Sequence, residues 1–327
     1  MTSALSREVE TPQSRGQSKR QLSMTSPSKS CREFATHHGL VFNDFFEPEF
    51  VLLDCALEAF HDHNAQVGVN SVRFRNEGHL TWRYITALYQ RVHEQYSACA
   101  ICYFTGAWAS VEVLTRVVLE SAANTVYVSQ NPTQRLPRYL AHYFETEGKK
   151  VQRQQIYGRQ LTTEEKGLVD EAIAIGTSGL SSRRKLLEQI LRNDQLTIDG
   201  AEEWPASTFD LFRAIGWEAI YRDLYSTLSS QVHNDADSYV DYIIATAVSA
   251  IDSAGNLDAA SEVRMHVLHY FHSACAALLK ATESANAALG LHQTVVTKCK
   301  VELNPRLETN ASKLLALKRR NLLPHQI

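Results

Sequence analysis

Long stretches of this chain run without glycine or proline, and this scarcity is what most constrains its fold. The 327 residues include only 14 glycines and 8 prolines. A β-sandwich or β-barrel needs a turn roughly every 8–12 residues, and such turns depend on these two residue types. Apolar residues instead recur at intervals of three and four, the spacing that places them on one side of a helix. We therefore expect an all-α fold, a helical bundle.

The overall composition is that of an ordinary globular protein. Hydrophobic residues make up 44% of the chain and charged residues 21%, with a formal net charge of −3. This charge gives no global attraction to nucleic acid, so any such binding has to come from a local patch. No stretch reaches the roughly 18 uncharged apolar residues of a membrane span, and the nearest one, 98–115, is interrupted by Glu112. We expect no membrane partner.

The two ends of the chain differ from its middle. Residues 1–34 are rich in Ser, Thr, Gln and Arg and poor in large apolar side chains, so we expect a disordered tail. A helical bundle domain should cover 35–290, followed by a C-terminal extension, 291–327, with a basic cluster at Lys318-Arg319-Arg320. The six cysteines are scattered and no signal peptide precedes them, so we expect reduced thiols and a cytoplasmic location.

Helix starts and breaks can be placed within the bundle domain. We expect a first helix over 47–67, ended by Gly68, and then a tract over 78–128 that forms two helices or one helix kinked near Gly106. Further helices are expected at 139–155, from Thr162 onward, and at 183–191, 217–233 and 261–289, with a break at 176–182 and a loop at 193–207. A loop of that length tends to be functional or mobile.

Two patterns of metal-ligating residue types have simpler explanations. Cys99 and Cys102 form a CxxC motif, but it lies in an apolar helical run without a second such pair. His266, His269 and His272 follow one another at spacings of three, so the series drifts around a helix and no carboxylate shares its ridge. The chain also lacks a phosphate-binding P-loop, an HExxH motif and a nucleophile elbow. We expect no metal and no cofactor.

The segment from Trp217 onward carries two stripes of different character. The apolar stripe, which should face a core, consists of Trp217, Ile220, Leu224, Leu228 and Val232. A polar stripe on the other side consists of Arg222, Ser226, Ser229 and His233. The polar stripe is either a solvated face or a polar cluster inside a close helix crossing. The second alternative is suggested because serine is a weaker helix former than the Glu, Lys and Gln that usually cover a solvated face.

His233 stands where this helix should end, just before the turn-forming run Asn234-Asp235-Ala236-Asp237. A positive charge is favoured at a helix C-terminus, so we expect the pKa of His233 to be raised.

A helix in the first half carries three charges one turn apart. Glu112, Arg116 and Glu120 lie in the run VEVLTRVVLESAANTVYV, whose apolar residues surround the helix axis, so we expect the three to be largely buried. They form either an intrahelical ion ladder or a functional site, because a charge taken out of water costs several kcal/mol unless it is paired. We expect the polar stripe to pack against this helix, with His233 within hydrogen-bond reach of Glu120 or Arg116.

These two segments resemble a known family. The motifs R-x-x-x-E, from Arg116 to Glu120, and Y-x-x-L-S-x-x-x-H, from Tyr225 to His233, look like those of a family of uncharacterised bacterial helical proteins related in architecture to the HEPN superfamily. The resemblance covers about residues 45–280. It implies an antiparallel helical bundle that is often dimeric. Many HEPN proteins are metal-independent ribonucleases of toxin or antiviral systems with an R-x(4–6)-H motif. Arg264 and His269 satisfy this motif here, as do Arg73 with His79 and Arg320 with His325.

Two functions of different class fit these residues. One is a binding or oligomerisation module, in which a buried network of Arg, Glu and His side chains fixes how the helices pack. The other is a metal-independent ribonuclease acting on RNA or a nucleotide. Its catalytic residues would be His233 as general acid and base, Arg116 as stabiliser of anionic oxygens, and Glu120. Its binding residues would be Tyr225, Ser229, Arg222 and Glu112. The expected partners are a second copy of the chain in a homodimer, and RNA or a nucleotide.

Overall fold

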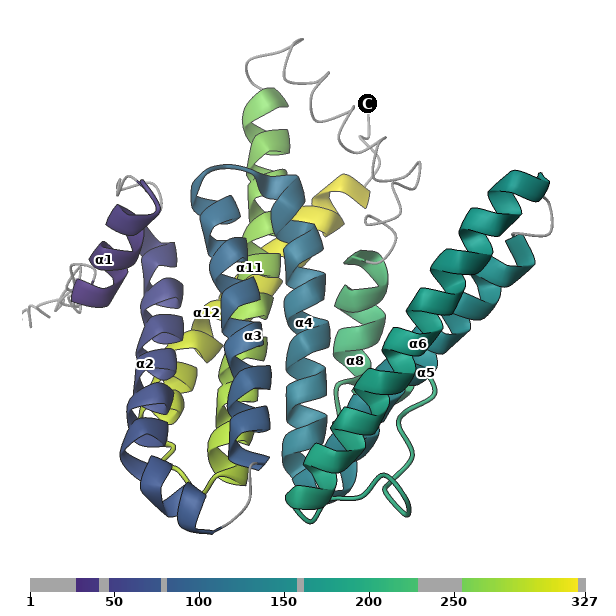
Figure 1. Cartoon of the computed structure of the whole chain (residues 1–327). Coiled ribbons are helices and arrows are strands. Elements are labelled where there is room, and N and C mark those ends of the chain that lie inside the picture. Colours follow the sequence, from purple (N-terminus) through teal and green to yellow (C-terminus); the bar gives the residue numbers. More distant parts are fainter. Residues whose placement is uncertain (1–27, 41–46, 78–80, 158–161, 229–254, 323–327) are drawn as a thin grey trace, which may run out of the picture.

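The computed structural model of the chain is all-helical, as predicted (Figure 1). It describes residues 28–40, 47–77, 81–157, 162–228 and 255–322, and no β-strand occurs in these ranges. The longer helices are α1 (Lys29–His37), α2 (Glu47–Asn76), α3 (Thr81–Phe104), α4 (Trp108–Gln130), α5 (Pro132–Tyr157), α6 (Thr163–Asn193), α11 (Gly255–Ala288) and α12 (Thr294–Leu322). Shorter helical pieces are α7 (Thr208–Ala214), α8 (Glu218–Ile220) and the π-helical turn η2 (Tyr221–Tyr225).

Helix α11 lies in the middle of the bundle, packed against α2, α3, α4 and α12. Its Phe271 is fully buried and stacks on two tyrosines of α3, with ring centroids 4.5 Å from Tyr103 and 5.6 Å from Tyr96. Stacked aromatic rings of this kind bury large apolar areas and add a geometric preference to the packing. The three rings therefore fix how α3 and α11 lie against each other.

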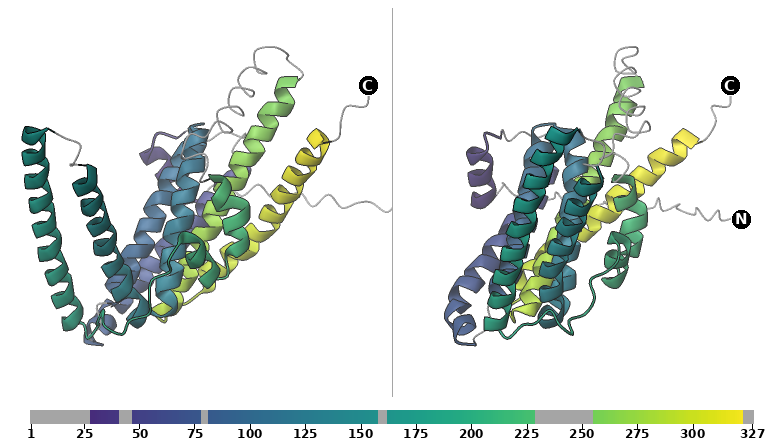
Figure 2. Two further views of the ribbon diagram at one scale, coloured as in Figure 1. Left: turned by 90° about the vertical axis from the view of Figure 1, so that its right-hand side faces the viewer. Right: turned by 45° about the vertical axis from the view of Figure 1, so that its right-hand side comes forward.

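Helix α12 adds to the same core. Its Val296, Cys299 and Leu303 are each at most 2% exposed, and Lys298 forms an ion pair with Glu58 of α2 at 3.2 Å. Figure 2 shows α12 crossing the bundle at an angle to α11. The first turns of the segment assigned to a C-terminal extension thus pack on α2 and α11.

Glycines expected to end helices lie inside helices instead. Helix α2 continues through Gly68 to Asn76, and α6 continues through 176–182 to Asn193, so both predicted boundaries are wrong. A glycine inside a helix costs about 1 kcal/mol relative to alanine, which the packing of a long helix can outweigh. Gly106 does separate α3 from α4, because its φ of +77° is a backbone conformation that glycine adopts readily.

Helices α5 and α6 form a hairpin that leans away from the bundle (Figures 1 and 2). A second, smaller apolar cluster at its base consists of Val128, Leu136, Leu191 and Leu196. Trp204 packs on this cluster and on the main core, so it connects the two. Helix α6 begins at a capping box between Thr162 and Glu165, as the sequence predicts, and beyond the base it packs mainly on α5.

The chain after the hairpin reaches α4 through short helical pieces. Ser207 caps α7, and Gly216, with a φ of +76°, turns the chain into α8. A single α-helix was predicted from Trp217 onward, but the turn Tyr221–Tyr225 is π-helical, with the Ser226 N–H bonded to the Tyr221 carbonyl. π-Helical turns are rare, and they are frequent at functional sites.

Candidate functional site

Tyr225, the last residue of the π-helical turn, joins that turn to α4. Its hydroxyl donates a hydrogen bond to Glu120 Oε2 at 3.2 Å. The guanidinium carbon of Arg116 lies 5.1 Å from the centroid of its ring, within cation–π range. The tyrosine is buried, with 4% of its surface exposed. We call Arg116, Glu120 and Tyr225 the Arg–Glu–Tyr cluster.

Both local structure and packing bring these three side chains together. Arg116 and Glu120 are one turn apart on α4 and therefore share a side of that helix. The Tyr225 ring is held by two other aromatic rings, with centroids 5.1 Å from Phe212 of α7 and 5.1 Å from Tyr221 at the start of the π-helical turn. The position of the tyrosine is thus fixed by ring packing as well as by the hydrogen bond to Glu120.

Glu120 lies between two tyrosines. Burial raises the pKa of Tyr225, the Glu120 carboxylate raises it further, and the Arg116 guanidinium lowers it. Burial and Glu120 also raise the pKa of Tyr139 on α5. Both phenols therefore keep their protons at neutral pH. The Tyr225 phenol serves as a hydrogen-bond donor and not as a base.

Glu112, Arg116 and Glu120 are only partly buried, so the prediction that they are largely buried is wrong. Helix α4 borders solvent on this side, as the 38% exposure of Val113 shows. Within the described part of the chain, no ion pair joins Arg116 to either glutamate, so the ion-ladder alternative is not supported there. Arg116 reaches across to Tyr225 instead.

Arg222 and Ser226 are exposed, so the prediction that the polar stripe packs on α4 is wrong for these two residues. Arg222 pairs with Glu218 at 2.8 Å, and the Ser226 hydroxyl donates to the Arg222 carbonyl. Leu224 and Leu228 of the apolar stripe are buried, because burying apolar surface is favourable and requires no compensating partners.

Two residues predicted for the site, Ser229 and His233, lie outside the described residues. The expected contact between His233 and Glu120 or Arg116 therefore stays a prediction.

A second group of residues, which the sequence analysis missed, lies next to the cluster. Arg135 binds Glu202 through two hydrogen bonds of 2.8 and 3.1 Å, and the Tyr127 hydroxyl donates to the same carboxylate at 3.0 Å. The ring of Trp204 lies 5.0 Å from that of Tyr139. These contacts fasten the loop before α7 onto α4 and α5. In the sequence, the only sign of these contacts was the length of that loop, because long loops tend to be functional or mobile.

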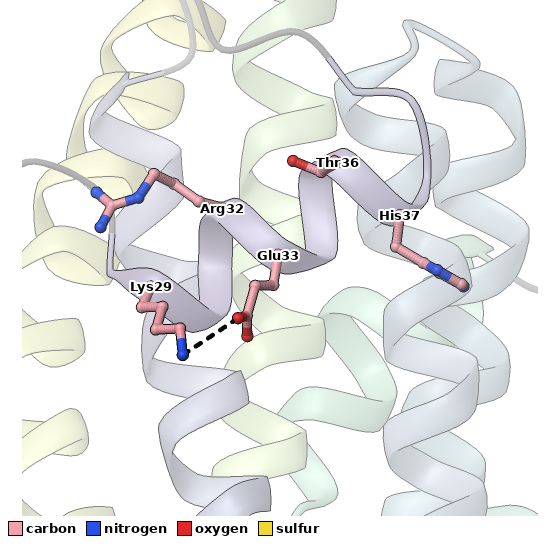
Figure 3. A pocket seen from close by; sticks show the side chains of 5 residues that line it. All are labelled: Lys29, Arg32, Glu33, Thr36 and His37. Carbon is pink, nitrogen blue, oxygen red and sulfur yellow. Dashed lines mark ion pairs between the residues drawn. The ribbon is translucent and has the colours of Figure 1, made fainter.

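Helix α1 carries a group of exposed polar side chains with the residue types of a binding site. Figure 3 shows Lys29, Arg32, Glu33, Thr36 and His37 on this one helix, with Lys29 and Glu33 paired at 3.5 Å. The Lys29 and Glu33 side chains are 85% and 66% exposed. Because all five come from one helix surface, they enclose nothing, and the Arg–Glu–Tyr cluster is the stronger candidate.

The R-x4-H pair Arg264 and His269 lies on α11, away from the cluster. Arg264 pairs at 3.6 Å with Glu49, a residue that is 4% exposed. Burial raises the pKa of Glu49, and Arg264 lowers it. His272, further along α11, is 3% exposed, and burial lowers its pKa to about 3. Arg264 thus has a structural partner. Among the described residues, no group of three or more His, Cys, Asp or Glu is placed to hold a metal ion.

The fold and the site define the chain as a helical-bundle protein with a partly buried Arg–Glu–Tyr cluster. It belongs to DUF5677, a family of unknown function whose profile matches residues 83–247. The match runs from α3 past η2, so it contains the whole cluster, whereas Arg264 lies outside it. Comparison with curated proteins and with solved structures found no match.

The relation to the HEPN superfamily stays a hypothesis.

In the part of the chain that the structure describes, no helix is long and apolar enough to cross a membrane.

Proposed function

We propose that this protein is a binding module that recognises RNA or a nucleotide at the Arg–Glu–Tyr cluster. The observation that carries the proposal is the position of Arg116, which stacks toward Tyr225 and forms no ion pair with a carboxylate in the described part of the chain. A guanidinium that stacks on an aromatic ring keeps its in-plane N–H groups available, and these match the geometry of a phosphate.

The rest of the cluster suits the other groups of a nucleotide. Glu120 accepts one hydrogen bond from Tyr225 and has acceptor capacity left for a ribose hydroxyl. The six free cysteines support the further proposal that the protein works in the reducing cytoplasm. We also propose that it acts as a homodimer.

Binding of a fluorescent single-stranded RNA and of a mononucleotide would test this function. Arg116→Met removes the charge but keeps a similar length, and we expect it to weaken binding about tenfold or more, because a hydrogen bond to a charged group contributes about 1.5–3 kcal/mol. Arg213→Met is the matched control, because it removes an exposed arginine of α7 that pairs with Asp210 and belongs to no part of the cluster. If both variants bind as wild type, or if the wild type binds neither ligand, the proposal is wrong.

A ribonuclease is the second candidate, because Arg116 and Glu120 place an anion stabiliser beside a carboxylate. In this reaction His233 or Glu120 would take the proton from a ribose 2′-hydroxyl, whose oxygen attacks the phosphorus. The bond between the phosphorus and the 5′-oxygen then breaks, and the general acid donates a proton to that oxygen. The products are a 5′-hydroxyl and a 2′,3′-cyclic phosphate. His233→Ala and Glu120→Gln should abolish cleavage while leaving RNA binding measurable. Intact RNA after incubation with the wild type would exclude this candidate and leave the binding module.

A further inference from the structure

Helix α6 has two apolar faces, and among the described residues only one of them is covered. The covered face packs on α5 through Ile173 and Leu191, which are 8% and 1% exposed. On another side, Leu168, Ile175 and Leu186 are 67%, 67% and 57% exposed. Figure 2 shows α6 at the outer edge of the molecule, with α5 between it and the bundle. Three large apolar residues that share one exposed face indicate a contact surface.

The exposed face is a regular stripe. Its positions alternate at spacings of four and three, the pattern of a two-helix coiled coil. The stripe consists of Leu168, Ala172, Ile175, Gly179, Ser182 and Leu186, all of them exposed. At about 100° per residue, these positions fall within an arc of about 80°. The large residues Leu168 and Leu186 stand at the two ends of the stripe. Between them, Ile175 is the one large residue, and the other positions hold Ala172, Gly179 and Ser182.

The stripe complements itself when two copies run antiparallel. A twofold axis near Thr177 pairs Leu168 with the Leu186 position, and Ile175 with the Gly179 position. A large side chain thus meets a small one in the middle of the contact, and the larger residues meet at its ends. Self-complementarity about an axis is what a twofold symmetric interface requires.

The charges of α6 favour the same arrangement. Its first half carries four acidic residues and one lysine, and its second half carries four basic residues and one glutamate. Antiparallel pairing therefore places opposite charges together, whereas parallel pairing places like charges together. Glu171 and Lys185 flank the stripe and face each other across the axis, and within the described residues neither forms an ion pair in its own chain.

We propose that the stripe of α6 binds the same stripe of a second copy of this chain, antiparallel, with Ile175 packed against Gly179. This inference rests on the proposed homodimer and locates its interface. The stripe from Leu168 to Leu186 is about 27 Å long at 1.5 Å per residue. A two-helix contact of this length lies at the small end of specific interfaces, so the dissociation constant should be micromolar.

Sedimentation of the full chain from about 1 to about 100 µM tests the interface. We expect wild type to pass from monomer to dimer over this range. Ile175→Glu should weaken the dimer at least tenfold, because it places a charge at the apolar centre. Ala174→Glu is the matched control: it adds the same charge at the next position, on an exposed side of α6 away from the stripe, and should leave the dimer unchanged.

Charge reversal tests the direction of pairing. Glu171→Lys and Lys185→Glu should each weaken the dimer, because each places like charges across the axis. The double variant Glu171→Lys/Lys185→Glu should restore it, because the opposite charges have only changed places. Failure of the double variant to recover would overturn the antiparallel arrangement.

The outcomes separate this inference from the proposed homodimer. A wild-type dimer that Ile175→Glu leaves intact would place the interface elsewhere and overturn the inference, while the homodimer survives. A wild type that stays monomeric at the highest concentration would overturn both, and the stripe would then be covered by another protein or by another part of the chain. Circular dichroism of each variant shows whether α6 still folds.

Discussion

The Tyr225 hydroxyl donates a 3.2 Å hydrogen bond to Glu120, although the two residues are 105 positions apart in the sequence. The bond exists only when the π-helical turn is docked on α4. Removal of either partner therefore reports on docking and not on the strength of either helix alone.

Tyr225→Phe should lower the free energy of unfolding by about 1 kcal/mol. The substitution keeps the ring beside Arg116 and removes only the hydroxyl that Glu120 accepts, and a net hydrogen bond of this kind contributes about that much. Urea unfolding followed by circular dichroism measures the change. Tyr221→Phe is the control: its hydroxyl makes no hydrogen bond within the described residues, so we expect a change below about 0.5 kcal/mol. Equal effects of the two variants would contradict the prediction.

Glu202→Gln should destabilise the protein by about 1 kcal/mol and expose the loop before α7 to proteases. The substitution removes the charge from a carboxylate that is bound twice by Arg135, a side chain only 16% exposed. Glu188→Gln removes an equally charged group from exposed pairs with Arg184 and Arg192, so it should change stability very little. A loop that resists proteases equally in both variants would refute the anchoring role of Glu202.

Trp204→Ala should cost about 2–4 kcal/mol, because the indole ring contacts both apolar clusters. We also expect the hairpin to open separately from the bundle, so that proteolysis in α5 or α6 becomes faster than global unfolding. Pulse proteolysis at increasing urea concentrations measures both processes. If the variant unfolds in one step with unchanged protection of α6, Trp204 is not the connection between the clusters.

Gly68→Ala should stabilise the protein by about 0.5–1 kcal/mol. The position is helical and exposed, and no heavy atom lies within 4 Å of an added Cβ. Gly106→Ala should have the opposite sign and cost about 1 kcal/mol, because its φ of +77° disfavours a Cβ. Thermal unfolding of the pair measures both changes. A destabilised Gly68→Ala would mean that α2 does not continue through this position.

The protein should lose stability as the pH falls from about 6.5 toward 4, in part through His93. Burial lowers the pKa of His93 to about 4, so the unfolded chain takes up a proton in this range that the folded chain does not. Between the unfolded and the folded pKa, each such histidine lowers the free energy of unfolding by about 1.4 kcal/mol for every unit that the pH falls. This loss of stability is complete below the folded pKa. His93→Gln should make the dependence less steep by about one proton in urea titrations at several pH values. An unchanged slope would show that His93 titrates normally.

The sequence predicted those features of the fold that depend on periodicity. The all-helical class, the break at Gly106 and the capping box at Thr162 all follow from local residue preferences and are present in the structure. The continuation of α2 through Gly68 could not be predicted in this way, because the weak local preference of one glycine is outweighed by the packing of a long helix against its neighbours.

The candidate site was predicted in part. Arg116, Glu120 and Tyr225 were singled out, and they do come together. The contact is made by Tyr225, which lies at the edge of the buried apolar face, and not by the polar stripe that contains Arg222. The reason is the π-helical turn, which a pattern with a period of 3.6 residues cannot indicate. The contacts of Arg135 with Glu202 were missed because they join a helix to an irregular loop, where no periodicity exists.

The π-helical turn Tyr221–Tyr225 is equivalent to one residue inserted into an ordinary helix. Each added residue rotates everything that follows by about 100° around the helix axis. The turn thus changes the rotation about the helix axis between the residues before it, which pack on α7, and the residues after it, Ser226 to Leu228. Deletion of one residue in the turn would regularise the helix and strengthen its local hydrogen bonding. It would also rotate Ser226 to Leu228 to a different side of the helix axis. The more regular helix would therefore pack less well on α4.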